Sequence, residues 1–158
     1  MEREKIICFL EEIGIPVIET ELPDDCFLPG LAIEKNTILM DPAKMKYPGD
    51  LLHEAGHIAV TEEALRPLIG TADMDPEWPT PGDEIASILW SYAALRHIGI
   101  SPEVVFHAHG YKEQSEWFIE QFGNQNYIGL PLLEWMGFCS QTEKEGIKPF
   151  PHMIKWLR

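Results

Sequence analysis

The segment His53-Glu54-Ala55-Gly56-His57 has the residue types and the spacing of a zinc-binding motif. On a helix, His53 and His57 lie four residues apart and therefore project from one face. Two neutral imidazoles at this spacing can bind one tetrahedral zinc ion. Glu54 follows the first histidine and can take a proton from a zinc-activated water. The sequence therefore predicts one Zn²⁺ ion, with His53 and His57 as ligands and Glu54 as general base.

A zinc site of this type needs a third protein ligand, and Glu84 is the best candidate. It follows His57 by 27 residues (84 − 57) and falls in the first turn of the next strongly predicted helix. Asp83 is the rival. Because Asp83 can form a capping box with Thr80, it already has a local role, and Glu84 is left free to face the metal.

His107, His109 and Tyr111 form a second cluster of chemically competent residues. The two histidines are alternative third ligands at long range. Peptide hydrolysis also forms an oxyanion that a histidine or tyrosine beside the metal can stabilise, so His109 and Tyr111 are further catalytic candidates. A surface position at a helix end explains any one of these histidines more simply.

The histidine motif needs a helix, and residues 50–62 have the apolar pattern of one: Leu51, Leu52, Ala55, Ile58 and Ala59. A second helix is predicted over 81–98, with Thr80 as N-cap, Pro81 at the first position and Gly99 at the end. Residues 63–82 contain four prolines and two glycines, which predicts a long irregular loop with at most a short helix. Loops of this length in a compact domain often have a function.

The rest of the chain predicts a mostly helical protein with one β-hairpin. Residues 31–34 and 37–40 flank Lys35-Asn36 and are expected to pair, and residues 16–18 form a short extended piece. Further helices are expected at 2–13, 102–108, 111–122, 130–136 and 150–157.

Composition narrows the class of protein. A length of 158 residues fits a single domain spanning 1–158. The net charge of −14 disfavours binding to nucleic acid. No apolar run reaches the length of a membrane span, and the N-terminus does not read as a signal peptide. Three widely spaced cysteines predict reduced thiols in the cytoplasm rather than disulfides.

The motif, with Gly82-Asp83-Glu84-Ile85-Ala86-Ser87 and the small apolar run at 92–95, resembles the gluzincin branch of the zincin superfamily. More narrowly, it resembles the small ImmA/IrrE-type metallopeptidase domains over roughly residues 30–100. The resemblance implies a zincin-like α+β fold in which a small antiparallel or mixed sheet packs on the motif helix. It also implies His53, His57 and Glu84 as ligands and Glu54 as general base. The long proline-rich loop and the ending Arg96-His97-Ile98-Gly99 depart from the family pattern.

These residues lead us to expect a zinc-dependent peptidase that acts on a protein or peptide. The alternative is a non-catalytic zinc-binding regulatory domain that works through a protein partner. Glu54 argues against that alternative, because a purely structural zinc site does not need it. A metal-free helical protein with a coincidental motif is the third possibility.

Overall fold

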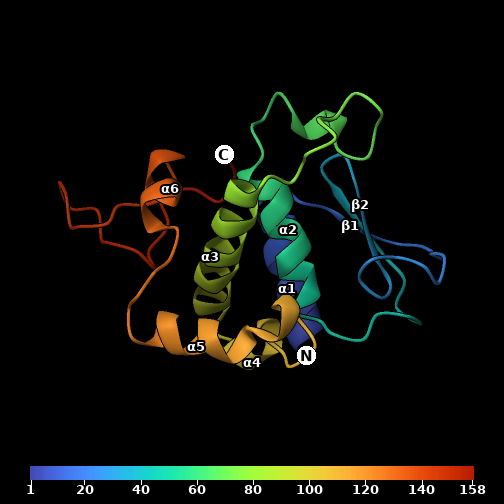
Figure 1. Cartoon of the computed structure of the whole chain (residues 1–158), viewed down its shortest axis with the longest axis horizontal. Coiled ribbons are helices and arrows are strands. Elements are labelled where there is room, and N and C mark those ends of the chain that lie inside the picture. The colour runs from blue at the N-terminus through green and yellow to red at the C-terminus, as the bar shows by residue number, and fades with distance from the viewer.

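The computed structural model describes all residues, 1–158, and contains six α-helices and a three-stranded sheet (Figure 1). The expected α+β, mostly helical fold class is confirmed. In chain order the elements are α1 (Glu2–Glu12), β1 (Val17–Glu19), β2 (Leu31–Glu34), β3 (Thr37–Met40), α2 (Asp50–Val60), the 3₁₀ turn η1 (Arg66–Leu68), α3 (Pro81–Ile98), α4 (Pro102–Val105), the 3₁₀ turn η2 (Tyr111–Glu113), α5 (Ser115–Gly123) and α6 (Leu130–Trp135).

The sheet is mixed, with strand order β1-β3-β2. β2 and β3 form the predicted antiparallel hairpin, and Lys35 takes a left-handed conformation (φ 57°) at its tip. The short extended piece near residue 17 becomes β1, which pairs parallel to β3 with Val17 opposite Ile38. The sheet lies beside α2, as Figure 1 shows.

α2 and α3 run side by side through the centre of the molecule (Figure 1). Every residue of α3 from Ala86 to Leu95 is buried, so this helix is covered on all sides. A helix with no solvent face is a core element rather than an amphipathic surface helix. The central position of α3 fixes its first turn, which carries Glu84.

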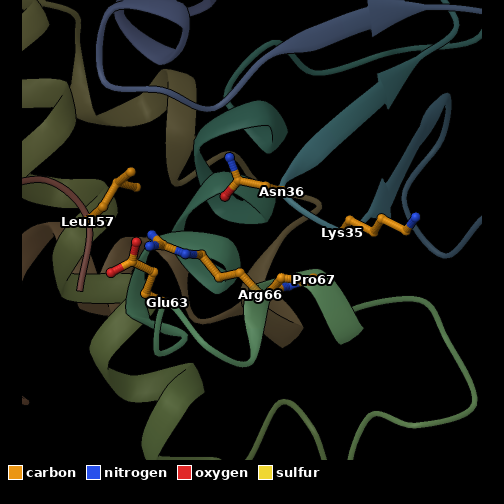
Figure 2. Close-up of a pocket in the computed structure, with 6 residues that line it drawn as sticks. All are labelled: Lys35, Asn36, Glu63, Arg66, Pro67 and Leu157. Atoms are coloured by element: carbon orange, nitrogen blue, oxygen red, sulfur yellow. The ribbon is translucent and has the colours of Figure 1, made fainter.

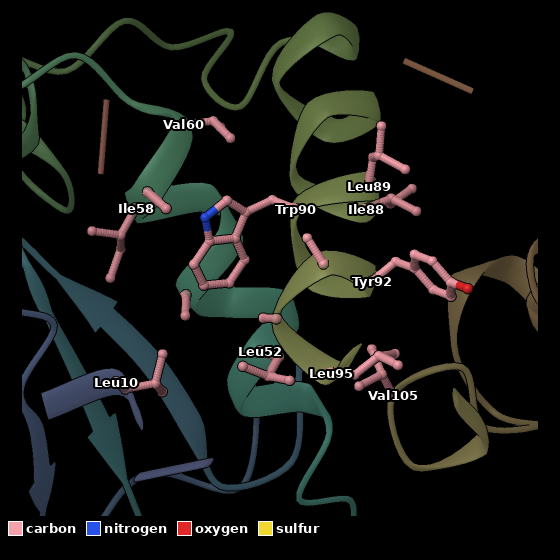
Figure 3. Packing of buried hydrophobic residues seen from close by; sticks show 14 of the residues in the cluster. Leu10, Leu52, Ile58, Val60, Ile88, Leu89, Trp90, Tyr92, Leu95 and Val105 are labelled. Carbon is pink, nitrogen blue, oxygen red and sulfur yellow. The ribbon is translucent and has the colours of Figure 1, made fainter. Parts of the chain in front are cut away.

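Trp90 of α3 is the largest fully buried side chain. It belongs to a hydrophobic cluster of 32 buried residues that draws on α1, the sheet, α2 and α3, and Figure 3 shows its neighbours in this cluster. Its indole N–H donates to the carbonyl oxygen of Trp156 at 3.1 Å, so its one polar atom is satisfied. Phe9 of α1 packs edge-on against Trp156 at 4.9 Å between ring centroids.

Three predicted helices differ from those observed. The helix expected at 150–157 is absent, because Pro149 and Pro151 remove backbone donors and Trp156 is used to cover the core. The helix expected at 102–108 ends at Val105. The helix expected at 111–122 begins only at Ser115, since residues 111–113 all have positive φ angles of 53° to 67°.

None of the helices combines the length and the hydropathy needed to cross a membrane.

Candidate metal centre

α2 places the two motif histidines on one face, as the four-residue spacing predicts. The opposite face of the helix is held in the core by Leu51, Leu52 and Ile58, which are fully buried. The ring centroids of His53 and His57 lie 4.8 Å apart, with the rings almost perpendicular. The histidines are therefore adjacent and held by a helix that is itself fixed.

Gly56 sets how closely α3 approaches this helix. A Cβ atom at Gly56 would lie 2.9 Å from the carbonyl oxygen of Ser87 and 3.0 Å from its Cβ. Any larger residue would force the two helices apart, so glycine is required by the close backbone approach. The second variable position of the motif is therefore a packing residue, and it brings the first turn of α3 beside the histidines.

The carboxylate of Glu84 reaches both histidines. Its Oε2 atom lies 2.6 Å from Nε2 of His57, and its Oε1 atom lies 3.7 Å from Nε2 of His53. The two imidazoles thus direct the same nitrogen toward one carboxylate. This is the residue that the sequence favours as third ligand.

His53, His57 and Glu84 have the donor types of a zinc site. Ligand atoms that share a tetrahedral zinc are roughly 3.4 Å apart, given Zn–N and Zn–O distances of about 2.0–2.2 Å. The 3.7 Å separation of Glu84 and His53 is close to that value, whereas the 2.6 Å separation of Glu84 and His57 is that of a hydrogen bond and would have to lengthen around an ion. Two imidazole nitrogens with one carboxylate oxygen form a known zinc ligand set.

Glu54 also lies close, since ligand atoms of His53, Glu54 and His57 fall within 4.8 Å of one another. Its Oε1 atom is 3.8 Å from Nδ1 of His57, on the other side of that ring from Glu84. Burial raises the pKa of Glu54 to about 7. A carboxylate with a pKa near neutrality suits a general base, and both Glu54 and Glu84 lie within reach of the histidines as carboxylate donors.

The two histidines differ electrostatically. Burial, with the neighbouring His57, lowers the pKa of His53 to about 4, so its imidazole is neutral near pH 7. Burial opposes protonation of His57 as well, but the hydrogen bond to Glu84 and the charge of Glu54 outweigh it and raise the pKa. His57 also lowers the pKa of Glu84, despite partial burial of that carboxylate.

Asp83 forms the predicted capping box. The Asp83 backbone N–H donates to Oγ1 of Thr80 at 3.1 Å, and the Thr80 backbone N–H donates to Oδ2 of Asp83 at 3.0 Å. This pair fixes the start of α3. The carboxylate of Asp83 is therefore committed to the cap, which is why the neighbouring Glu84 faces the histidines.

His107 and His109 do not join the candidate metal centre. His107 Nε2 lies 2.7 Å from Oδ1 of Asp50, and its Nδ1 accepts from the backbone N–H of His109 at 3.3 Å, so both ring nitrogens are engaged. His109 is exposed and stacks on Tyr47. The sequence did not identify Asp50 as a partner of His107, because 57 residues separate them and no local pattern links them.

Tyr111 lies against the candidate metal centre. Its ring centroid is 4.9 Å from that of His53, and its hydroxyl group is buried without a hydrogen-bond partner in the protein. Burial raises the pKa of Tyr111, so the phenol keeps its proton and can donate. Of the two oxyanion candidates from the sequence, Tyr111 is the one that contacts a motif histidine.

Trp78, from the proline-rich loop, covers another side of the site. Its ring centroid lies 6.1 Å from that of His57, and its indole N–H donates to Oγ1 of Thr61 at 3.0 Å. The loop is therefore anchored to the end of α2.

Comparisons with known protein families, with curated proteins and with solved structures find no match to this chain. The candidate metal centre is thus defined by its own residues: His53, Glu54, His57 and Glu84.

Proposed function

We propose that this protein is a zinc-dependent peptidase with His53, His57 and Glu84 as zinc ligands. One observation carries the proposal. The carboxylate of Glu84 approaches Nε2 of both histidines, while a second and largely buried carboxylate, that of Glu54, lies beside them without a hydrogen bond. A structural zinc site needs only the three proposed ligands, His53, His57 and Glu84. Only a hydrolytic site also has a use for Glu54.

A zinc ion held there would supply Lewis acidity and lower the pKa of the attacking water. Glu54 takes the proton from that water and delivers it to the departing amine, which its raised pKa near 7 allows. Tyr111 is our candidate donor to the oxygen on which negative charge develops, because its ring lies against His53 and its phenol stays protonated. His109 has no part in this scheme, because it lies outside the site on Tyr47.

The substrate class is a protein or peptide rather than a nucleic acid. The net charge of −14 repels phosphate backbones and attracts basic segments. We also infer action in the cytoplasm, since Cys8, Cys26 and Cys139 are all free thiols.

A non-catalytic zinc-binding domain is the second candidate. The low exposure of the site favours it, because the side chains of His53 and Glu54 are only 15% and 14% exposed. Structural zinc sites are closed, whereas catalytic sites keep a position open. The exposed side is at Glu84, whose side chain is 38% exposed, and this is the side from which a peptide would enter.

Metal content tests zinc binding, which both candidate functions require. We expect about one zinc per chain by elemental analysis after dialysis, and less than about one tenth in His53→Ala. Substoichiometric zinc that is the same in both proteins would show that the motif is coincidental.

Glu54→Gln separates the two candidates. We expect the variant to keep its zinc and to lose at least about 100-fold in cleavage of a peptide library, because the proton acceptor is gone. Glu116→Gln makes the same chemical change at an exposed position on α5 and should leave cleavage unchanged. Zinc-loaded wild type that cleaves nothing, alongside an equally loaded variant, would favour the binding domain.

A further inference from the structure

A second candidate site lies between the tip of the β2–β3 hairpin, the segment that follows α2, and the C-terminal segment. It is a pocket of about 280 Å³. Figure 2 shows the six residues that line it: Lys35, Asn36, Glu63, Arg66, Pro67 and Leu157. None of them belongs to the candidate metal centre.

Arg66 is the unusual member of this pocket. It is only 9% exposed, yet its guanidinium group forms no ion pair with the protein, and its buried Nη1 atom has no hydrogen-bond partner. A buried charge is costly unless it is paired and hydrogen-bonded. The guanidinium group points along the pocket toward the side where Glu63 lies (Figure 2).

Asn36 supplies an acceptor to the same pocket. Its Nδ2 atom donates to the carbonyl oxygen of Gly14 at 2.7 Å, which fixes the orientation of the amide. Its Oδ1 atom is buried and accepts no hydrogen bond. An unpaired donor in Arg66 and an unpaired acceptor in Asn36 thus lie in the wall of the pocket, and Glu63 adds a carboxylate.

The walls of the pocket are held by backbone hydrogen bonds. The Lys35 N–H donates to the carbonyl oxygen of Ile69 at 2.9 Å, which ties the hairpin tip to the segment after η1. The Arg158 N–H donates to the carbonyl oxygen of Ala59 at 2.9 Å, which ties the C-terminal segment to α2. A preformed site loses little ordering entropy on binding.

We propose that this pocket binds an α-carboxylate group with an N–H donor on the neighbouring carbon, as in a free amino acid or the last residue of a peptide. The carboxylate pairs with Arg66, in the geometry that a guanidinium group favours. The N–H donates to Asn36 or Glu63, and an apolar side chain contacts Pro67 and Leu157.

The volume of the pocket and the net charge of the protein support this ligand class over a simple anion. Pockets for drug-sized ligands begin at roughly 300 Å³, so this one suits a small molecule. The net charge of −14 repels a phosphate or sulfate dianion more strongly than a ligand with a single carboxylate. The proposal does not depend on zinc or on peptidase activity.

Calorimetric titration of the full chain tests the ligand class with four probes: leucine, N-acetylleucine, leucinamide and inorganic phosphate. We expect saturable binding of leucine, of N-acetylleucine or of both, since each has the carboxylate and an N–H donor. The stronger of the two identifies a free amino acid or a peptide terminus as the source. Binding of leucinamide or phosphate as tight as that of leucine, or no saturation by any probe below about 10 mM, would overturn the proposal.

Arg66→Met tests the role of the guanidinium group. We expect binding to be lost while the melting temperature without ligand stays the same or rises, because an unpaired buried charge is replaced by an apolar chain. Arg3→Met, at a half-exposed arginine on α1, is the matched control and should bind normally. A fall of roughly 5 °C or more specific to Arg66→Met would show that Arg66 has an internal partner and would overturn the proposal.

Nuclear magnetic resonance of the wild-type protein gives a readout that needs no variant. The Nε–Hε signal of Arg66 should shift with leucine in a saturable manner, while that of Arg3 stays in place. An unchanged Arg66 signal in the presence of bound leucine would place the binding elsewhere.

Discussion

α2 carries two histidine–carboxylate pairs of nearly equal length that lie in different surroundings. Near the start of the helix, Asp50 Oδ1 lies 2.7 Å from Nε2 of His107. About two turns later, His57 Nε2 lies 2.6 Å from Oε2 of Glu84. Each pair joins α2 to a distant part of the chain, and distance alone does not distinguish them.

The neighbours of each pair make the difference. His107 is closed on both sides, because Nδ1 accepts from the His109 N–H and the ring stacks on Tyr47 with 4.0 Å between centroids. His57 instead lies beside a second imidazole, His53, and an uncommitted carboxylate, Glu54. A metal centre therefore needs further donors that have no other partner, whereas a closed pair serves to join two segments.

The largest expected effect separates the two pairs by zinc affinity. His57→Ala removes one of the three proposed ligands and should weaken zinc binding by at least about 100-fold. His107→Ala should leave the affinity unchanged within about threefold, since His107 is engaged by Asp50. Competition with a fluorescent chelator measures both, and equal losses in the two variants would remove the distinction.

The stability of the metal-free protein should fall more in His107→Ala than in His57→Ala, the reverse of the order expected for zinc affinity. His107→Ala leaves the buried carboxylate of Asp50 unpaired and should lower the free energy of unfolding by about 3 kcal/mol. The protein would remain folded, because domains of this size are stable by roughly 5–15 kcal/mol. Urea unfolding of metal-free protein measures the change, and a loss below about 1 kcal/mol would mean that the pair does not join the segments.

Gly56→Ala tests whether the spacing between α2 and α3 positions Glu84 against His57. The added methyl group meets Ser87, so we expect a loss of about 1–3 kcal/mol in stability and roughly tenfold weaker zinc binding. Gly123→Ala on α5 is the control, since no atom lies within 4 Å of its new Cβ. A Gly56→Ala protein that keeps full affinity would show that Glu84 is positioned by its capping box alone.

The smallest effect concerns Tyr47, whose ring stacks on the histidine of the His107–Asp50 pair. Tyr47→Ala removes the ring that stacks on His107 and should lower the free energy of unfolding by about 1 kcal/mol, with zinc binding unchanged. A double-mutant cycle with His107→Ala isolates the contact. Additive losses would indicate that the two rings do not interact energetically.

Features with a local signal could be predicted from the sequence. The histidine spacing predicted one helical face, and the Thr80–Asp83 box predicted which acidic residue stays free. The hairpin around Lys35-Asn36 followed from its alternating flanks.

Features set by tertiary structure could not be predicted. Asp50 reads as an ordinary first-turn carboxylate, and only folding brings His107 to it. The segment 150–157 has apolar residues at helical spacing, yet its prolines and the packing of Trp156 on Trp90 override that pattern. Arg66 carries no motif at all, and its burial comes from the hairpin and the C-terminal segment meeting over it.

The burial of α3 from Ala86 to Leu95 has a consequence for motion. We expect amides at the centre of this helix to exchange with solvent mainly through global unfolding, and Glu84 lies two residues before this buried segment. Tyr111 comes from the left-handed segment 111–113, whose amides should exchange by local opening. We therefore expect the two segments that bring Glu84 and Tyr111 to the motif histidines to differ in local mobility, with slower amide exchange along Ala86–Leu95 than at residues 111–113.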